Sequence, residues 1–255
     1  ALRHAPLQPA DRPALPFLAR FSLLTGSARL PQAFPGCCRP LLLVLLLLTL
    51  CCPAAGPDRT VLQKQLVARF GPGRIGLLDD WLQLVAAAKP LDEGTKLQAV
   101  NDFFNRHIVF DDDLNIWRQS DYWATPLETI GRGRGDCEDF AIAKYYSLRL
   151  AGVPVARMRL VYVKARLSTG AGEVQQAHMV LAYYAKPSAE PLVLDNLQTA
   201  IQPASRRADL QPVFSFNSEG IFAGVSGALK ASSGGIGRLS RWQDLLQRAR
   251  AEGFE

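Results

Sequence analysis

The sequence predicts an α+β fold, with helices first along the chain and an antiparallel sheet after them. Two observations indicate this class. Between residues 61 and 151, apolar side chains recur every three or four positions, the period of an amphipathic helix. Between residues 158 and 194, short runs rich in Val, Leu and Tyr are separated by turn-forming residues, which is typical of strands. Helices followed by strands in one chain favour an α+β domain.

Three helices are predicted at the start of the domain. The first two cover residues 61–70 and 75–88, and the helix-breaking sequence Gly-Pro-Gly at 71–73 separates them. The third covers residues 91–107. We expect the aromatic and aliphatic residues on one face of each helix to form the core.

A short fourth helix is predicted to begin at Pro126. Thr125 precedes it and Glu128 follows at the spacing of a capping box, in which each side chain bonds the backbone of the other residue. The glycines within residues 131–135 are expected to break this helix.

Three strands are predicted after the helices. Residues 158–167 and 177–184 form the first two, and the glycine-rich residues 168–172 form the turn between them. A short third strand covers residues 192–194. These three strands are expected to form an antiparallel sheet.

The chain is expected to divide into three parts: a leader over residues 1–55, a domain over residues 56–222, and a C-terminal segment over residues 223–255. The C-terminal segment begins with small residues at 223–237, which we expect to form a flexible loop. It ends with a basic amphipathic helix at 241–251.

The leader contains the features of a secretory signal peptide. Residues 41–50 are almost all Leu and Val, and this run is too short for a membrane span, which needs about 20 apolar residues. Arg39 precedes the run, and small residues follow it, so cleavage is expected near Ala55. The alternative interpretations are a single-span anchor and a buried helix.

Removal of the leader lowers the net charge of the protein. Five of the 29 basic residues and one of the 23 acidic residues lie before Gly56, so the net charge falls from +6 to +2. The remaining sequence has no cluster of Lys and Arg typical of a nucleic-acid-binding surface. We therefore expect no nucleic-acid partner.

Cys137 is the strongest candidate for a catalytic residue. It would be the only cysteine of the mature chain, so it has no partner for an intramolecular disulfide. It begins a helix predicted over residues 137–151, with Asp136 as the N-cap and Gly152 after the last turn. The first turn of a helix favours a thiolate, which is the nucleophilic form of cysteine. The alternative is a buried structural cysteine.

A nucleophilic thiol needs a base, and residues 56–255 contain two histidines. His107 ends a predicted helix and is interpreted as a surface residue. His178 lies at the start of the second predicted strand, and Asp195 follows the third. Because adjacent antiparallel strands can bring these side chains together, Cys137, His178 and Asp195 are predicted to form a catalytic triad. A turn residue is the alternative interpretation of Asp195.

Three carboxylates flank the thiol and should oppose its ionisation: Asp136, Glu138 and Asp139. One interpretation is that the two aspartates cap the helix while Glu138 is solvated. The other is that all three bind a hard cation that prefers oxygen ligands, such as Ca²⁺. The acidic run at residues 111–113 is considered a weaker candidate.

Several segments of the chain resemble the bacterial transglutaminase-like cysteine proteinases. The resemblance covers roughly residues 60–222, and the segment around Cys137 is the most specific. The matching segments are 100–105 (VNDFFN), 121–126 (DYWATP), 133–139 (GRGDCED), 152–154 (GVP), 177–179 (AHM), 194–196 (LDN) and 212–217 (PVFSFN).

The resemblance implies a papain-like/transglutaminase-like fold and a periplasmic, Ca²⁺-dependent endopeptidase. It implies cleavage of the N-terminal region of a large RTX-type surface adhesin, and hence release of cells from a biofilm. It also implies control by an inner-membrane cyclic-di-GMP receptor that sequesters the protease. Cys137, His178 and Asp195 match the family's catalytic residues. The positions of the family's calcium ligands are matched by Asp136, Glu138 and Asp139.

Two other functions remain open at this point. The same triad could serve a transglutaminase or amidase that joins or trims amide side chains. The chain could also be an inactive module that keeps the fold and binds a receptor. The presence of all three triad residues argues against the inactive module.

Overall fold

The computed structural model of the protein describes residues 56–170, 172–223 and 240–254. The predicted signal-peptide core at 41–50, and residues 224–237 of the predicted flexible loop, lie outside the described residues. Within the described part of the chain, no helix has both the length and the apolar character needed to cross a bilayer.

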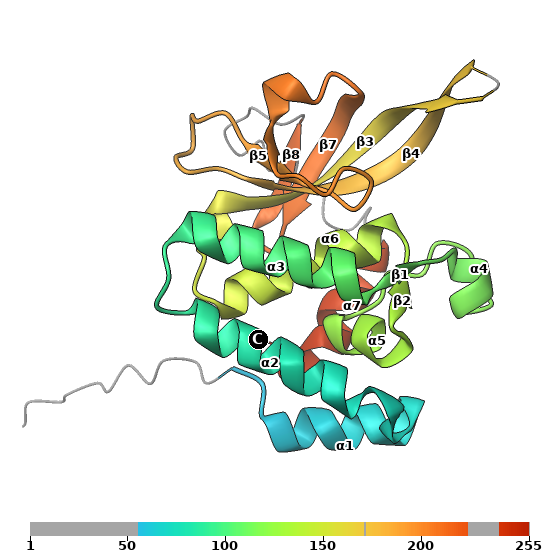
Figure 1. The fold of residues 1–255 in the computed structure, drawn as a ribbon, viewed down its shortest axis with the longest axis vertical. Coiled ribbons are helices and arrows are strands. Elements are labelled where there is room, and N and C mark those ends of the chain that lie inside the picture. The colour runs from blue at the N-terminus through green and yellow to red at the C-terminus, as the bar shows by residue number, and fades with distance from the viewer. Residues whose placement is uncertain (1–55, 171, 224–239, 255) are drawn as a thin grey trace, which may run out of the picture. The chain divides into compact units, whose positions relative to one another are not determined.

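Three long helices begin the fold, as the sequence predicts (Figure 1). They are α1 (Arg59–Phe70), α2 (Ile75–Ala88) and α3 (Glu93–His107). Asp58 caps α1 by accepting a hydrogen bond from the Val61 amide, and Asp92 caps α3 in the same way. The predicted bounds of α2 are confirmed, and those of α1 and α3 differ by two residues at the start.

Four further α-helices follow in the part of the chain that the structure describes, three of them before the main sheet and one after it. They are α4 (Asp113–Ile116), α5 (Pro126–Arg132), α6 (Cys137–Leu150) and α7 (Ser240–Ala251). The capping box predicted at the start of α5 is present. Gly131 lies inside α5, which ends one residue before Gly133, so the prediction that Gly131 breaks the helix is wrong. Gly133 has a φ of 62° and can therefore reverse the chain there.

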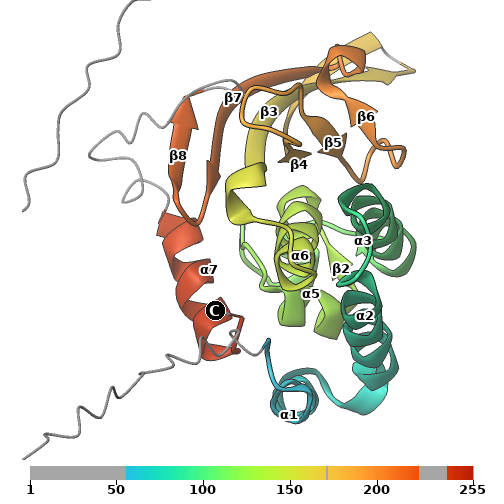
Figure 2. The same cartoon turned by 90° about the vertical axis from the view of Figure 1, so that its left-hand side faces the viewer.

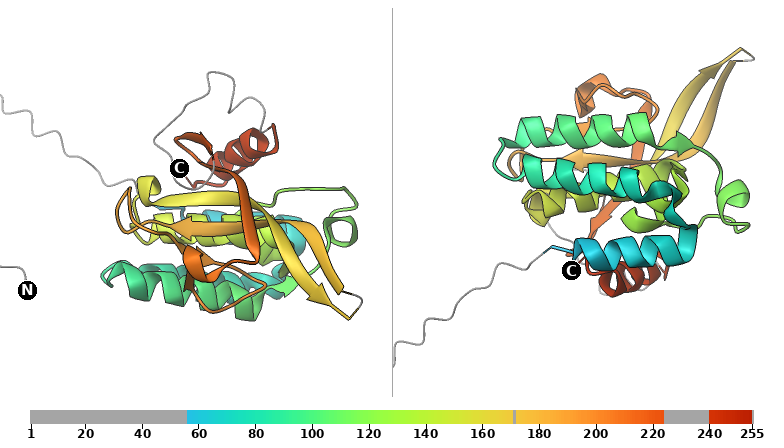
Figure 3. Two further views of the ribbon diagram at one scale, coloured as in Figure 1. Left: turned by 90° about the horizontal axis from the view of Figure 1, so that it is seen from above. Right: turned by 60° about the horizontal axis from the view of Figure 1, so that its bottom comes forward.

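Within the described residues, the main sheet contains six antiparallel strands in the order β6-β5-β4-β3-β7-β8. These are β3 (Met158–Thr169), β4 (Gly172–Tyr183), β5 (Leu192–Leu194), β6 (Gln202–Pro203), β7 (Leu210–Asn217) and β8 (Gly220–Ala223). The bounds predicted for β5 are confirmed. β4 begins five residues earlier than predicted, because it stays paired with β3 up to Thr169 opposite Gly172. As a result, the β3–β4 hairpin extends well beyond the neighbouring strands (Figures 1 and 3).

Helices cover one face of this sheet and form the main core with it (Figure 2). α6 lies at the centre, packed against β4, and is buried along most of its length. Trp81 from α2 reaches α6 and donates a buried hydrogen bond of 2.7 Å to Ser147. A two-stranded parallel sheet, β1 (Val109–Phe110) and β2 (Arg134–Gly135), lies beside the start of α6. The mixture of helices and antiparallel sheet confirms the predicted fold class.

The C-terminal helix α7 belongs to the same core. Trp242 and Leu245 are buried, and the Trp242 ring packs edge-on against Tyr145 of α6 and Phe216 of β7. The folded unit therefore extends beyond residue 222, where we expected the domain to end.

Candidate active site

The fold places the Cys137 thiol at the N-terminus of the central helix. Cys137 is the first residue of α6 and is half-buried, and it is the only cysteine among the described residues. Asp136 occupies the N-cap position with an extended backbone, but its side chain makes no capping hydrogen bond. The Asp136 carboxylate thus accepts no hydrogen bond from the first-turn amides of α6. It lies instead among the other acidic side chains near the thiol.

Gly135 lets the chain pack closely against α6. A Cβ atom at this position would lie 2.7 Å from the Cβ of Asp139, which is closer than side chains approach. The glycine-rich run before Cys137 therefore serves close packing within the same chain.

His178 and Asp195 meet on adjacent strands. Leu181 of β4 lies opposite Leu194 of β5, and Asp195 comes directly after that strand. His178 Nε2 lies 2.8 Å from Asp195 Oδ1, and both side chains are almost completely buried. The short third strand thus brings together two residues that are 17 positions apart.

The protein itself satisfies both oxygens of the Asp195 carboxylate. Oδ1 accepts hydrogen bonds from His178 and from the Leu197 amide, and Oδ2 accepts a 2.6 Å hydrogen bond from Arg207. Although burial opposes ionisation, the bonds from His178 and Arg207 lower the pKa of Asp195 to about 2. Asp195 is therefore a carboxylate at neutral pH.

Two side chains of the helical layer hold the backbone of Asp195. Lys144 Nζ donates to the Asp195 carbonyl at 3.0 Å, and Asn105 Nδ2 donates to the same oxygen at 2.9 Å. Burial lowers the pKa of Lys144 to about 7, although the charge of Asp195 acts in the opposite direction. Neither Lys144 nor Arg207 was identified from the sequence. A lysine in an otherwise apolar stretch of α6 was the only available signal.

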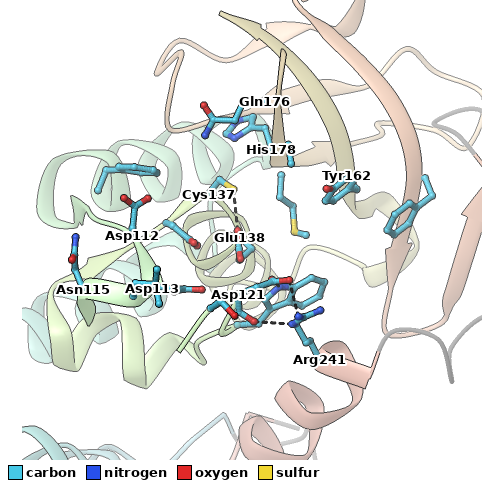
Figure 4. Close-up of a pocket in the computed structure, with 18 residues that line it drawn as sticks. Asp112, Asp113, Asn115, Asp121, Cys137, Glu138, Tyr162, Gln176, His178 and Arg241 are labelled. Atoms are coloured by element: carbon cyan, nitrogen blue, oxygen red, sulfur yellow. Dashed lines mark hydrogen bonds and ion pairs between the residues drawn. The ribbon is translucent and has the colours of Figure 1, made fainter. Parts of the chain in front are cut away.

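The thiol and the His178 side chain line the same cleft but are not hydrogen-bonded to each other in the described structure. The Cys137 sulfur instead bonds Glu138 Oε2 at 3.0 Å (Figure 4). Burial raises the pKa of the Cys137 thiol well above its usual range, and the charge of Glu138 adds to this effect. In this arrangement burial and the carboxylates next to the sulfur keep the thiol protonated.

A cluster of three carboxylates, two of them buried and one half-buried, lies beside the thiol. Oxygens of Asp113, Asp136 and Asp139 lie within 4.8 Å of one another. Each residue has a buried oxygen without a hydrogen-bond partner: Asp113 Oδ1, Asp136 Oδ1 and Asp139 Oδ2. Burial raises the pKa of all three, to about 6 for Asp113 and to about 10 for Asp136, and the charges of neighbouring carboxylates add to this effect.

This cluster differs from the one expected from the sequence. Asp113, from the acidic run that we considered a weaker candidate, lies in it, because α4 turns its first residue inward to 4% exposure. Glu138 instead belongs to a second group with Asp136 and Cys137, whose ligand atoms also lie within 4.8 Å of one another. Asp136 and Asp139 are at the positions named from the sequence. Carboxylate oxygens that converge and accept no hydrogen bond suit a hard divalent cation, which prefers oxygen ligands.

The segment that links α4 to α5 holds the cluster together. The Tyr122 amide donates to Asp113 Oδ2, and the Ala124 amide donates to Asp139 Oδ1 at 2.7 Å. Arg248 of α7 fixes the same segment through a 2.7 Å bond to the Trp123 carbonyl.

A cleft of about 680 Å³ gives access to the thiol (Figure 4). Its walls come from the residues around α4, from the start of α6, and from β3, β4 and β7, and include Asp112, Trp123, Cys137, Tyr162, His178 and Phe214. An indole N–H in this cleft could serve as an oxyanion donor, and Trp123 supplies one. Its N–H donates to Asp121 at 2.9 Å and is therefore already engaged.

His107 does not contribute to this cleft. It lies exposed at the end of α3, with its ring 4.7 Å from that of Phe103. This agrees with its interpretation as a surface residue.

A helix N-terminus that carries a thiol, next to a histidine–aspartate pair on a sheet, is the arrangement of papain-like and transglutaminase-like enzymes. The family model described as bacterial transglutaminase-like cysteine proteinase matches residues 85–209, which include all three of these side chains. The chain belongs to the bacterial transglutaminase-like cysteine proteinases.

Solved structures of Legionella pneumophila LapG are similar to this chain over nearly their whole length. One is 36% identical, with a TM-score of 0.61, over 76% of this chain and 99% of that one. A calcium-bound structure matches at 36% identity and 0.61, over 75% and 98%. An EGTA-treated structure matches at 36% and 0.63, over 76% and 99%. A comparison with curated proteins returned no significant match.

Proposed function

We propose that this protein is a periplasmic, Ca²⁺-dependent cysteine endopeptidase that cleaves the N-terminal region of a large RTX-type surface adhesin. Cleavage would release cells from a biofilm, under the control of an inner-membrane cyclic-di-GMP receptor of the LapD type. The observation that carries the proposal is the buried His178–Asp195 pair, whose histidine lines the same cleft as the Cys137 thiol.

The side chains divide the work of acyl transfer among them. His178 takes the thiol proton at Nδ1, since Nε2 is engaged with Asp195. The sulfur attacks the peptide carbonyl, and the Cys137 amide at the start of α6 donates to the developing oxyanion. The imidazolium then gives its proton to the departing amine. Water, deprotonated by His178, hydrolyses the thioester and frees the enzyme.

Asp195 contributes by orientation and charge. Its hydrogen bond fixes the tautomer of His178, and its negative charge stabilises the imidazolium that forms during the reaction. The low pKa of Asp195 ensures that this charge is present at neutral pH.

Asp113, Asp136 and Asp139 would hold the cation, because each has a buried oxygen without a donor. A bound Ca²⁺ supplies positive charge that offsets the carboxylates beside the thiol. Glu138, also predicted as a ligand, lies next to this cluster, because its carboxylate is within 4.8 Å of that of Asp136. The calcium-bound LapG structure supports Ca²⁺ as the cation.

The substrate, the receptor and the periplasmic location rest on the family resemblance. The predicted signal peptide supports export, and the similarity to LapG supports a related role.

The test uses residues 56–255 with the N-terminal fragment of a large adhesin from the same genome. Cleavage is followed on gels with calcium, with a calcium chelator, and with Cys137→Ala. We expect cleavage by the native protein in calcium only. Cleavage by Cys137→Ala would contradict the role of the thiol, and cleavage in the chelator would contradict the role of the cation.

A parallel reaction with a small primary amine separates hydrolysis from transamidation. A protease gives cleaved adhesin with little incorporated amine. Amine incorporation without cleavage would instead favour the transglutaminase alternative.

A further inference from the structure

The N-terminal half of β4 has an unpaired edge that leads into the cleft. On one side, β4 pairs with β3 along its whole length, from Gly172 to Tyr183. On the other side, β5 pairs only with Leu181–Tyr183. No other strand among the described residues pairs with that second side, and the residues from Gly172 to Ala177 are exposed.

The same short strand that positions Asp195 leaves this edge open. β5 ends at Leu194, opposite Leu181, and the chain turns away at Asp195 to meet His178. The open edge therefore begins next to the catalytic histidine and runs about 20 Å out along the hairpin.

Backbone hydrogen bonds show which residues point to the open side. The Tyr184 amide donates to the Arg157 carbonyl across the β3–β4 pair. The backbone N–H and C=O groups of the even-numbered residues of β4 therefore point towards β3. The Arg166 amide donates to the Asp209 carbonyl, away from its β4 partner Gln175. Both bonds give the same alternation, in which the amides and carbonyls of the odd-numbered residues face outward: Glu173, Gln175, Ala177 and Met179.

The outward-facing backbone is continuous with the reacting groups. Ala177 and Met179 line the cleft that contains Cys137 and His178. A polypeptide whose peptide carbonyl reaches the sulfur must leave the cleft along one of its walls. On this wall the Met179 amide bonds the Cys137 sulfur. Farther along, no other described strand pairs with the outward backbone groups of Ala177, Gln175 and Glu173, which lie at strand spacing.

We propose that the substrate adds to the sheet as an extended strand along the open edge of β4, pairing with the backbone of Glu173, Gln175 and Ala177. The occupant is a proline-free segment of the substrate polypeptide next to the cleaved bond. The backbone supplies the binding, so the segment is selected for its ability to extend more than for particular side chains. This inference rests on the proposed endopeptidase function.

The first test compares Gln175→Pro with Gln175→Ala, both in calcium. Proline removes the outward amide and is tolerated at a strand edge, whereas alanine removes only the side chain. The substrate is a peptide of about 12 residues that spans the cleavage site mapped in the adhesin fragment. We expect KM for Gln175→Pro to exceed that of Gln175→Ala by about tenfold, with kcat changed much less. Equal KM values for the two variants would overturn the proposal.

The second test leaves the enzyme unchanged and therefore does not depend on the folding of a variant. Single ester bonds replace successive amides of the same peptide, so that each peptide lacks one N–H donor. Strand pairing predicts that KM rises at every second position on one side of the cleaved bond. Uniform effects, or none, would overturn it. If the wild-type protein shows no Cys137-dependent cleavage of the fragment, the proposed function fails as well. Cleavage without alternation overturns the strand pairing alone.

Discussion

Carboxylates lie on two sides of the Cys137 thiol, and the two sides differ in which hydrogen-bond donors they find within the protein. On one side, both oxygens of Asp195 accept hydrogen bonds from residues of the same chain. On the other side, Asp113, Asp136 and Asp139 each have a buried oxygen with no donor. The pKa of Asp195 is lowered, and the pKa values of the other three are raised. The protein therefore completes one site itself and leaves the other for a cation.

Charge follows the same division. Asp195 forms an ion pair with the buried Arg207, and a second one with His178 when the imidazole is protonated. Within the described residues, none of the three clustered aspartates forms an ion pair, and the charge of Glu138 adds to their repulsion. Substitutions on the two sides should therefore affect different properties: catalysis and stability at Asp195, and calcium affinity at the clustered aspartates.

The largest effect is expected from Asp195→Ala. It removes the group that orients His178, and kcat should fall by about 10³-fold or more. It also removes the fully buried one of the two carboxylates that pair with the buried Arg207, so the free energy of unfolding should fall by about 3–5 kcal/mol. Steady-state cleavage and urea unfolding measure the two effects. A variant with wild-type kcat would contradict the role of Asp195.

The next effect contrasts two neighbours in the acidic run. Asp113 is buried in the cluster, whereas Asp112 is exposed at the rim of the cleft. Asp113→Asn should weaken calcium binding by about tenfold or more, because a charged ligand is lost. Asp112→Asn, the matched control, should change it little. Calcium titrations of the cleavage rate measure both, and equal effects would contradict the position of the cation.

A smaller effect is expected in acid. The pKa of Asp195 is about 2 in the folded protein and about 4 when unfolded, so its ionisation stabilises the fold above pH 4. This contribution, about 2 kcal/mol, is lost as the pH falls from 4 towards 2. The difference in unfolding free energy between the wild type and Asp195→Asn should shrink by that amount. A difference independent of pH would contradict the assignment.

The smallest effect is expected at the second partner of Arg207. Asp209 pairs with Arg207 at 2.8 Å, but its side chain is 38% exposed. Asp209→Asn should lower the free energy of unfolding by less than about 1 kcal/mol, since solvent screens exposed pairs. Urea unfolding measures this, and a loss as large as that of Asp195→Ala would mean that Arg207 depends equally on both carboxylates.

Local spacing predicted that the long helices precede the strands β3, β4 and β5, because a period of three to four or of two is a local property. It also named Cys137 and His178 as site candidates, whereas the choice of Asp195 depended on the family resemblance as well. It missed β7, whose exposure pattern does not alternate along the strand and so lacks the period of two. It also missed Arg207, which lies in a region without any clear pattern.

Asp113 could not be separated from its neighbours for a different reason. Three consecutive aspartates look alike in a sequence, and only packing decides which of them is buried. The amides of the segment between α4 and α5 reach Asp113 and Asp139 across distances that no local pattern encodes. The ligand set of a site built from separate elements therefore needs the structure.

The most direct test of this account is a calorimetric titration of calcium into the chelator-treated protein, with Asp113→Asn and Asp195→Asn beside the wild type. The account predicts calcium binding to the wild type, similar affinity for Asp195→Asn, and affinity at least about tenfold lower for Asp113→Asn. Wild-type protein that binds no calcium, or Asp113→Asn that binds it as tightly as the wild type, would contradict the claim that the clustered aspartates form a cation-binding site.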